Sequence, residues 1–310
     1  SGQALRQQLT DAQGAYSFNS LETGYDYTLT PILDENPLNG VSTFDLVLIS
    51  KHILGVEPLA SPYQMIAADT DNSKRITILD LINLRKLILS VDLEFSNNTS
   101  WRFVDAGYDF PQATNPWFED FPEVRNINDL QGSVMDANFI AVKIGDIDGN
   151  ARPSSLAAAE VRDIKGTFNF EVADEQLMAG NEYTVDFRAS DIADIQGFQG
   201  TLTFDASKVA LVDIVEGVAT ADNFGLTFVE EGVITTSWNG EANADEVLFS
   251  LVLRAESDVA LNQVLGVSSR YTVAEAYNQD DELMNVGIEF SNGTIASADF
   301  ALYQNTPNPF

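Results

Sequence analysis

Apolar and polar residues follow two different patterns along this chain, and the pattern changes near residue 160. Before that point, two apolar helical stretches, 46–54 and 81–89, each follow a polar loop. Beyond it, from about 164 to 296, short runs alternate apolar and polar positions between turn residues, as strands with one buried face do. The small and polar stretch 151–163 separates the two regions and is predicted to be a linker. The chain is therefore predicted to be multidomain and mainly β.

The alternating region predicts a β-sandwich or jelly roll over residues 164–297, because many short strands bounded by turns favour that architecture. Its clearest runs are 167–172, 183–187, 201–204, 233–238, 248–253 and 286–290. Residues 1–31 alternate in the same way around Gly14 and Gly24 and predict a β-hairpin. This hairpin is too short for a domain, so we interpret it as a remnant of an upstream β-sandwich.

The helical region contains an internal repeat with an offset of 35 residues. Each copy is a polar loop, 34–45 or 69–80, that runs into an apolar helix. Between the copies, Ser61 and Pro62 predict a short helix near 62–67, since serine caps a helix and proline suits its first turn. The aromatic-rich stretch 95–150 is expected to pack against these helices, which gives one module over residues 32–150.

The charge balance narrows the range of partners, because 47 acidic residues stand against 16 basic ones, for a formal net charge of -31. Such a surface repels nucleic acid and anionic membranes, and it suits hard cations that bind carboxylates. The sequence has no cysteine, which excludes disulfides, thiolate nucleophiles and Cys-ligated zinc or iron–sulfur sites. No apolar run approaches the length of a membrane span.

The second loop has the spacing of a calcium site. A calcium ion takes six to eight oxygen ligands, and EF-hand-type loops supply them from positions 1, 3, 5, 7, 9 and 12. Those positions offer side-chain oxygens or, at position 7, a backbone carbonyl; they are Asp69, Asp71, Ser73, Arg75, Thr77 and Asp80. We therefore expect Ca²⁺ as a cofactor here. The alternative interpretation is a solvated acidic loop that caps a helix.

The first loop follows the same spacing with one gap. Its oxygen-bearing positions are Asp34, Asn36, Gly40 through its carbonyl, Ser42 and Asp45. Position 5 is Leu38, which has no side-chain oxygen, so two interpretations stay open: a weak calcium site completed by water, or a metal-free scaffold. A separate acidic turn is a further candidate cation site, with Asp146, Asp148 and Asn150.

Both loops end in Asp and run into the motif Asp-Leu-x-x-Leu/Ile-x-Lys, at 45–51 and 80–86. With these motifs, residues 32–92 resemble a dockerin. The resemblance implies calcium-dependent binding of a protein partner, with loop positions 10 and 11 helping to set partner choice. Those positions are mostly apolar and imply a hydrophobic contact; they are Thr43, Phe44, Ile78 and Leu79. The alternative is that the aromatic stretch 95–150 covers them.

The β-region is similar to a cohesin in three stretches, 195–205, which begins Ile195-Gln196-Gly197-Phe198, then 232–238 and 269–277. This resemblance implies a nine-stranded jelly roll, and a carbohydrate-binding β-sandwich is the main rival. The tail 298–310, with Phe300-Ala301-Leu302-Tyr303 and a final Pro309-Phe310, resembles the opening of a type IX secretion sorting domain. That resemblance implies export across the outer membrane and an extracellular or cell-surface location.

The function predicted from these features is a non-catalytic, calcium-dependent assembly or adhesion module of a secreted or surface bacterial protein. Its partner would be a protein bound through the dockerin-like or cohesin-like surface, including a second copy of this chain joined head to tail. The alternative is a carbohydrate-binding or targeting appendage of a larger secreted hydrolase. No enzyme site is indicated, because no carboxylate pair stands out and the single histidine, His52, occupies the repeat position of Leu87.

Overall fold

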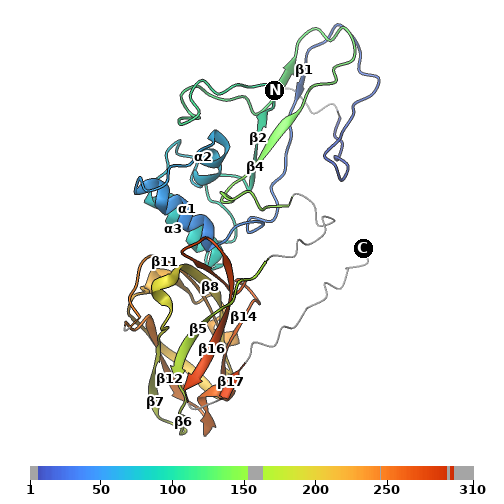
Figure 1. Ribbon diagram of the computed structural model, residues 1–310. Coiled ribbons are helices and arrows are strands. Elements are labelled where there is room, and N and C mark those ends of the chain that lie inside the picture. The colour runs from blue at the N-terminus through green and yellow to red at the C-terminus, as the bar shows by residue number, and fades with distance from the viewer. Residues whose placement is uncertain (1–5, 153–162, 245, 292–293, 297–310) are drawn as a thin grey trace. The chain divides into compact units, whose positions relative to one another are not determined.

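The computed structural model describes residues 6–152, 163–244, 246–291 and 294–296. Two compact units make up the chain (Figure 1). Unit 1 comprises Ser1–Leu84 and Leu93–Val161, and unit 2 comprises Arg85–Asp92 and Arg162–Phe310. Most of the predicted linker 151–163, and the whole of the tail 298–310, lie outside the described residues. No helix among the described residues is both long and apolar enough to cross a membrane.

Each of the three predicted helices is present, although α1 and α3 begin three residues earlier than the sequence pattern predicted. They are α1 (Thr43–Ile53), α2 (Pro62–Ala68) and α3 (Ile78–Ile88), whose last residues from Arg85 onward belong to unit 2. Ser42 caps α1 in a capping box with Asp45, and Ser61 caps α2 ahead of Pro62, so short polar side chains satisfy amides that the helices leave unpaired.

Two small antiparallel sheets complete unit 1. Strand β1 (Tyr27–Leu29) pairs with β3 (Arg125–Ile127), and β2 (Trp101–Asp105) pairs with β4 (Phe139–Lys143). The local hairpin predicted within residues 1–31 is therefore wrong for the described part of that segment, whose strand pairs about a hundred residues downstream. Local alternation shows that one face of a strand is covered, but it does not specify the partner strand.

The aromatic stretch packs against the helical part of the unit, as the sequence predicts. The ring of Tyr63 in α2 lies 5.5 Å from that of Phe110, edge to face. Phe110 in turn contacts Tyr108 at 5.1 Å and Phe121 at 5.8 Å between ring centroids. The guanidinium of Arg102 lies 4.9 Å from the centroid of the Phe121 ring. These rings form a small apolar cluster beside α2.

Unit 2 contains β-strands and short 3-10 turns in addition to the end of α3. Its strands are β5 (Thr167–Ala173), β6 (Gln176–Leu177), β7 (Glu182–Phe187), β8 (Ile195–Phe204), β9 (Val209–Glu216), β10 (Phe224–Gly225), β11 (Val233–Asn239), β12 (Phe249–Ala255), β13 (Val259–Ala260), β14 (Leu265–Ser268), β15 (Glu275–Asn278), β16 (Leu283–Ser291) and β17 (Thr294–Ala296). The predicted count of nine is not the count found, since thirteen strands lie among the described residues of unit 2, three of them only two residues long.

The strands of unit 2 form a large sheet and a smaller one. The large sheet has the order β10-β11-β8-β15-β16-β17, with β14 added on β8 and β5 parallel to β16. The smaller sheet has the order β7-β12-β9, and β13 pairs separately with β6. Both sheets contribute to one hydrophobic core, which is the arrangement of a β-sandwich.

Aromatic rings fill the centre of that core. Phe198 of β8 stacks on Trp238 of β11 at 5.3 Å, and Phe187 of β7 stacks on Phe249 of β12 at 4.4 Å. Side chains alternate between the two faces of a strand. Trp238 points into the core, so its neighbour Ser237 points to the opposite face of the large sheet.

Replacing Trp238 by alanine is predicted to lower the free energy of unfolding of unit 2 by about 3–5 kcal/mol, since the ring is only 4% exposed in the core. The matched control is Val212→Ala on β9, whose side chain is 45% exposed and whose loss is expected to cost under about 1 kcal/mol. Denaturant unfolding followed by circular dichroism measures both. Equal effects of the two changes would contradict this description of the core.

Candidate metal centres

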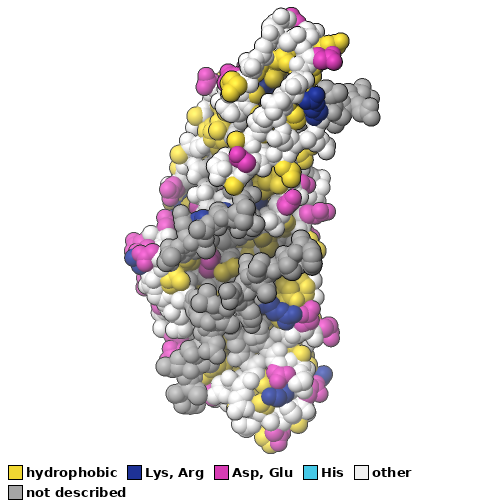
Figure 2. Space-filling view, turned by 90° about the vertical axis from the view of Figure 1, so that its right-hand side faces the viewer, with side chains coloured by type: hydrophobic (Ala, Val, Ile, Leu, Met, Phe, Trp, Pro, Cys, Tyr) yellow, Lys and Arg dark blue, Asp and Glu magenta, His cyan; other side chains and the backbone are white. Residues whose placement is uncertain are grey.

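Acidic side chains are spread over the surface seen in Figure 2, so a carboxylate matters only where the fold gathers several together. Two such groups are found among the described residues, both in unit 1. We call Asp69, Asp71 and Asp80 the loop site, and Asp45, Asp146 and Asp148 the composite site. In each group the three residues offer carboxylate oxygens that all lie within 4.8 Å of one another.

The loop site is built at the junction of α2 and α3. Asp69 ends α2, and its two carboxylate oxygens accept from the amides of Ser73 (2.8 Å) and Lys74 (2.9 Å). Asp80, in the first turn of α3, accepts from the amides of Thr70 and Thr77, both at 2.8 Å. The loop between them is therefore folded around its own carboxylates.

The composite site repeats this bonding pattern with two separate pieces of chain. The oxygens of Asp146 accept from the amides of Asn150 and Ala151, both at 3.0 Å. Asp45, in the first turn of α1, accepts from the amides of Ile147 (2.7 Å) and Ser42 (2.8 Å). Each bond has its counterpart at the same relative position in the loop site.

The sequence explains this correspondence. Residues 146–152 are Asp-Ile-Asp-Gly-Asn-Ala-Arg, and residues 69–75 are Asp-Thr-Asp-Asn-Ser-Lys-Arg. Likewise Ser42 and Asp45 correspond to Thr77 and Asp80. The composite site is thus the same twelve-position loop divided in two, with its first half supplied about a hundred residues after its second half.

The electrostatics of both groups disfavour three negative charges without a cation. Burial raises the pKa of Asp69 and of Asp146 to about 6. Asp45 is fully buried, and burial first, then the charge of Asp148, raises its pKa well above the usual range. Buried carboxylates of like charge hold protons more tightly than exposed ones.

The donor set fits a calcium ion. Calcium takes oxygen ligands at about 2.3–2.6 Å, so ligands on opposite sides of one ion are about 4.8 Å apart. Both groups offer only oxygen donors, with no histidine or cysteine, which argues against zinc. In the loop site the Ser73 hydroxyl lies 3.3 Å from the Arg75 carbonyl, so two further oxygens lie together at positions 5 and 7.

The first half of the first loop makes contacts away from the two carboxylate groups. Asp34 lies outside both carboxylate groups, and its Oδ1 accepts from the amide of Ser100 at 2.7 Å. The carbonyl of Pro37 accepts from the buried ammonium of Lys143 at 2.7 Å. Asn36 is exposed, and a Cβ on Gly40 would lie 2.6 Å from Ala151. This half-loop therefore supports the 143–152 segment, which supplies the carboxylates in its place.

Of the first-loop residues, Asp45 joins a carboxylate group and Ser42 lies beside it, with its hydroxyl 3.4 Å from Asp45. Sequence reasoning named Asp146, Asp148 and Asn150 as a separate site and missed their combination with Asp45. The signal that could have revealed it is the shared Asp-x-Asp-x-Asn/Ser-x-Arg spacing at 69–75 and 146–152.

The residues predicted to contact a partner fall into two classes. Ile78 and Leu79 at the start of α3 are 66% and 56% exposed. Their repeat equivalents differ, since Thr43 is fully buried and Phe44 is half-buried. Thr43 is therefore not available as a surface contact. An apolar face is exposed at the start of α3, and it is continued by Ile82, which is 40% exposed.

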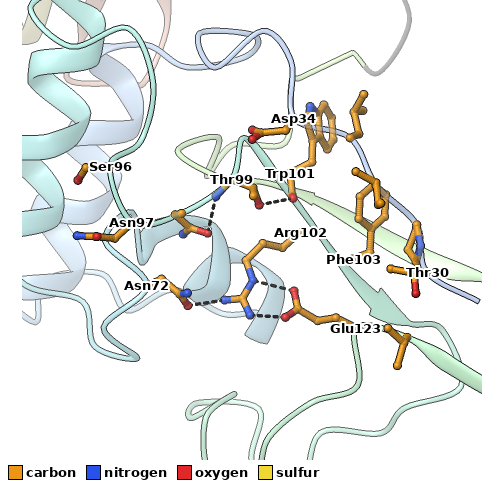
Figure 3. A pocket seen from close by; sticks show the side chains of 15 residues that line it. Thr30, Asp34, Asn72, Ser96, Asn97, Thr99, Trp101, Arg102, Phe103 and Glu123 are labelled. Atoms are coloured by element: carbon orange, nitrogen blue, oxygen red, sulfur yellow. Dashed lines mark hydrogen bonds and ion pairs between the residues drawn. The ribbon is translucent and has the colours of Figure 1, made fainter. Parts of the chain in front are cut away.

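A pocket lies next to the loop site, along strand β2 (Figure 3). Arg102 forms a bidentate pair with Glu123, with both contacts at 2.8 Å, and donates to Asn72 at 3.0 Å. The Asn98 amide donates to the carbonyl of Asp69 at 2.9 Å. The walls of this pocket are therefore tied to the 69–80 loop. Trp101, which also lines it, is only 7% exposed.

The single histidine has a structural position. Nδ1 of His52 accepts from the Leu59 amide at 3.1 Å, and burial lowers the pKa of the imidazole. The neutral ring therefore anchors the chain that leaves α1.

Comparison with known proteins gives structural likenesses alone. No protein-family model and no curated protein matches the chain. The seventh ScaB type I cohesin from Pseudobacteroides cellulosolvens is 19% identical, over 41% of this chain and 89% of that chain, with a TM-score of 0.29. A type I cohesin–dockerin complex from Clostridium thermocellum is 15% identical over 39% of this chain and 99% of that chain, with a TM-score of 0.29. A type II cohesin from Acetivibrio cellulolyticus is 10% identical over 40% of this chain and 91% of that chain, with a TM-score of 0.31. Likenesses with TM-scores near 0.3 carry no functional argument, so function has to be inferred from the residues of this chain.

In metal-free buffer, the free energy of unfolding of unit 1 is predicted to fall as pH rises from about 4 to about 6. The raised pKa values of Asp69 and Asp146 mean that the folded state binds more protons than the unfolded state in this range, so stability is lost as they ionise. Thermal unfolding with chelator present measures the slope. The double change Asp69→Asn, Asp146→Asn should flatten it, and a wild-type stability that rises with pH would contradict the prediction.

Proposed function

We propose that the chain is a non-catalytic protein-assembly module whose helical unit is held together by two calcium ions. The observation that carries the proposal is the pair of carboxylate groups, one continuous and one composite, which share the same bonding pattern in unit 1. Ligands would be Asp69, Asp71, Ser73, Arg75, Thr77 and Asp80 for one ion, and Asp146, Asp148, Asn150, Ser42 and Asp45 for the other.

Calcium would control the exposed apolar face through Asp80. This residue belongs to the first turn of α3, directly after Ile78 and Leu79, and its carboxylate has no lysine or arginine among its bonded partners here. Without a cation, repulsion from Asp69 and Asp71 opposes closure of the loop. With a cation, the first turn of α3 is fixed and the apolar side chains are presented in one orientation. Calcium binding and the ordering of the exposed apolar face at the start of α3 would then be coupled in a single equilibrium.

The partner of this face is proposed to be a protein, and a second copy of this chain is the candidate to test first. A contact between the start of α3 and a different surface of the next copy is heterologous, and it generates an open filament unless the rotation closes a ring. We also propose an extracellular or cell-surface location, on the resemblance of the tail 298–310 to a type IX sorting domain; that tail lies outside the described residues.

Glycan binding is the alternative role, and the pocket along β2 is one place in unit 1 to examine for it. Its planar polar groups are paired with one another, since Arg102 bonds both Glu123 and Asn72. Its tryptophan, Trp101, is almost fully buried, whereas a sugar-stacking ring needs an exposed face. These two features argue against glycan binding in this pocket.

Calcium titration is predicted to give two ions per chain. Asp71→Ala should remove one ion, and Asp148→Ala should remove the other, because each deletes a carboxylate from one group. The matched control is Asp34→Ala, which should leave both ions, since Asp34 lies outside the two groups. Isothermal titration calorimetry counts the sites. Loss of an ion on Asp34→Ala with two retained on Asp148→Ala would restore the continuous first loop as the site.

Self-association is predicted to need both calcium and the apolar face. Ile78→Asp combined with Leu79→Asp should leave calcium binding intact and abolish growth in mass with concentration, because a buried unpaired charge opposes an apolar contact by several kcal/mol, on the order of a hot spot. Multi-angle light scattering with calcium or chelator measures this. Met135→Asp, at a side chain that is 89% exposed, is the control. A wild type that stays monomeric at all concentrations would exclude a second copy as the partner.

A further inference from the structure

The two repeat helices, α1 and α3, each end in a turn of the same type. The sequence after α1 is Ile53-Leu54-Gly55-Val56, and the equivalent residues of α3 are Ile88-Leu89-Ser90-Val91. In both turns a valine amide donates to the carbonyl of the lysine five residues earlier. Val56 donates to Lys51 and Val91 donates to Lys86, both at 2.9 Å. This is a Schellman turn, whose left-handed position favours glycine. Gly55 occupies it in α1 at φ 71, but Ser90 occupies it in α3 at φ 54.

The two ends differ in burial. At the end of α1, Ile53 and Leu54, the equivalents of Ile88 and Leu89, are 40% and 76% exposed. At α3, Ile88 and Leu89 are each 2% exposed. The segment Arg85–Asp92 belongs to unit 2 and contacts other residues of that unit.

Three threonine hydroxyls of unit 2 bond the carbonyls at this helix end. Thr272 donates to the Ile88 carbonyl at 2.7 Å, Thr235 to that of Leu89 at 2.6 Å, and Thr227 to that of Ser90 at 3.2 Å. The last carbonyls of a helix have no partner within the helix. Here side chains from outside the helix satisfy them one after another.

The receiving surface is shaped for a close approach of backbone. A Cβ on Gly225 would lie 2.5 Å from the Leu89 carbonyl oxygen, so only glycine admits the segment there. Thr272 is itself held in place, because its amide donates to the hydroxyl of Thr201 at 3.0 Å. One turn before the helix end, Arg85 donates to Asn239 at 2.5 Å, whereas its repeat equivalent in α1 is Ser50.

We propose that this surface, which we call the hydroxyl face (Thr227, Thr235, Thr272, Gly225 and Asn239), is a docking site for the C-terminal turn of an α-helix. Its resident occupant is the chain's own segment Arg85–Asp92. The threonine hydroxyls of the site donate to the exposed carbonyls at the end of the helix. The side-chain oxygen of Asn239 accepts from a basic side chain one turn earlier in that helix. Any other protein that binds the hydroxyl face must first displace this segment. The inference does not depend on calcium or on the apolar start of α3.

Hydrogen–deuterium exchange tests the occupancy directly. In the wild type, the amides of Leu89, Ser90 and Val91 should be protected. In Thr235→Val with Thr272→Val, which removes two donors at constant side-chain size, they should exchange about tenfold faster or more, because two hydrogen bonds to the segment are lost. Two internal controls are the amides of Leu54–Val56, which should not change, and the variant Thr184→Val, on an exposed position of β7.

Unchanged protection of 89–91 in the double variant would overturn the proposal. Protection that appears only as the protein concentration rises would also overturn it, because the segment would then come from a second copy. Gly225→Ala offers a second route from the sheet side, since the added methyl group meets the Leu89 carbonyl. It should release the same amides while leaving the exchange of β12 unchanged.

A peptide of residues 78–93 of this sequence tests the site as a receptor. The wild type should bind it only weakly, because its own segment Arg85–Asp92 fills the hydroxyl face. Arg85→Glu with Leu89→Asp, which alters the segment and leaves the face intact, should bind it with an affinity at least about tenfold higher than the wild type. Fluorescence anisotropy of a labelled peptide measures this. Equal binding by both proteins, or no binding by a released variant whose strands retain their exchange protection, would overturn the proposal.

Discussion

Mutual repulsion among buried carboxylates is the constraint on which unit 1 depends. Each carboxylate group places three acidic side chains within 4.8 Å of one another, and Asp45, Asp69 and Asp80 are fully buried. Backbone amides turn toward these oxygens and stabilise part of the charge, but raised pKa values show that burial outweighs them. A divalent cation would remove this conflict, and this is the physical basis of the calcium proposal.

In the composite site, the repelling carboxylates come from two segments that lie far apart in the sequence. Its carboxylates come from the start of α1 and from a turn a hundred residues later, so one ion would close a long loop of chain. The half-loop 34–40 holds the segment that carries Asp146 and Asp148. The Pro37 carbonyl accepts from Lys143, and the Arg152 amide donates to the Asn39 side chain at 3.1 Å. One continuous loop and one divided loop therefore position the starts of α3 and α1.

The sequence was sufficient for features set by local patterning. The start of α2 followed from Ser61 and Pro62, and the strands of unit 2 followed from alternation. Pairings between distant segments were not predictable in this way. Strand β1 pairs with β3, and β5 lies parallel to β16, because tertiary packing selects the partner. The same limit explains Thr43 and Ile78, which hold equivalent repeat positions but differ between full burial and 66% exposure. Asp45 also keeps its predicted position at the end of a loop, while the carboxylates grouped with it come from residues 146–148.

Crystals grown with calcium and measured for anomalous scattering test the two-ion proposal most directly. We expect two peaks in unit 1, one bonded to Asp69, Asp71 and Asp80, and one bonded to Asp45, Asp146 and Asp148 together. A peak that joins Asp45 to Asp34 and Asn36, or a cation-free composite site beside an occupied loop site at saturating calcium, would contradict it.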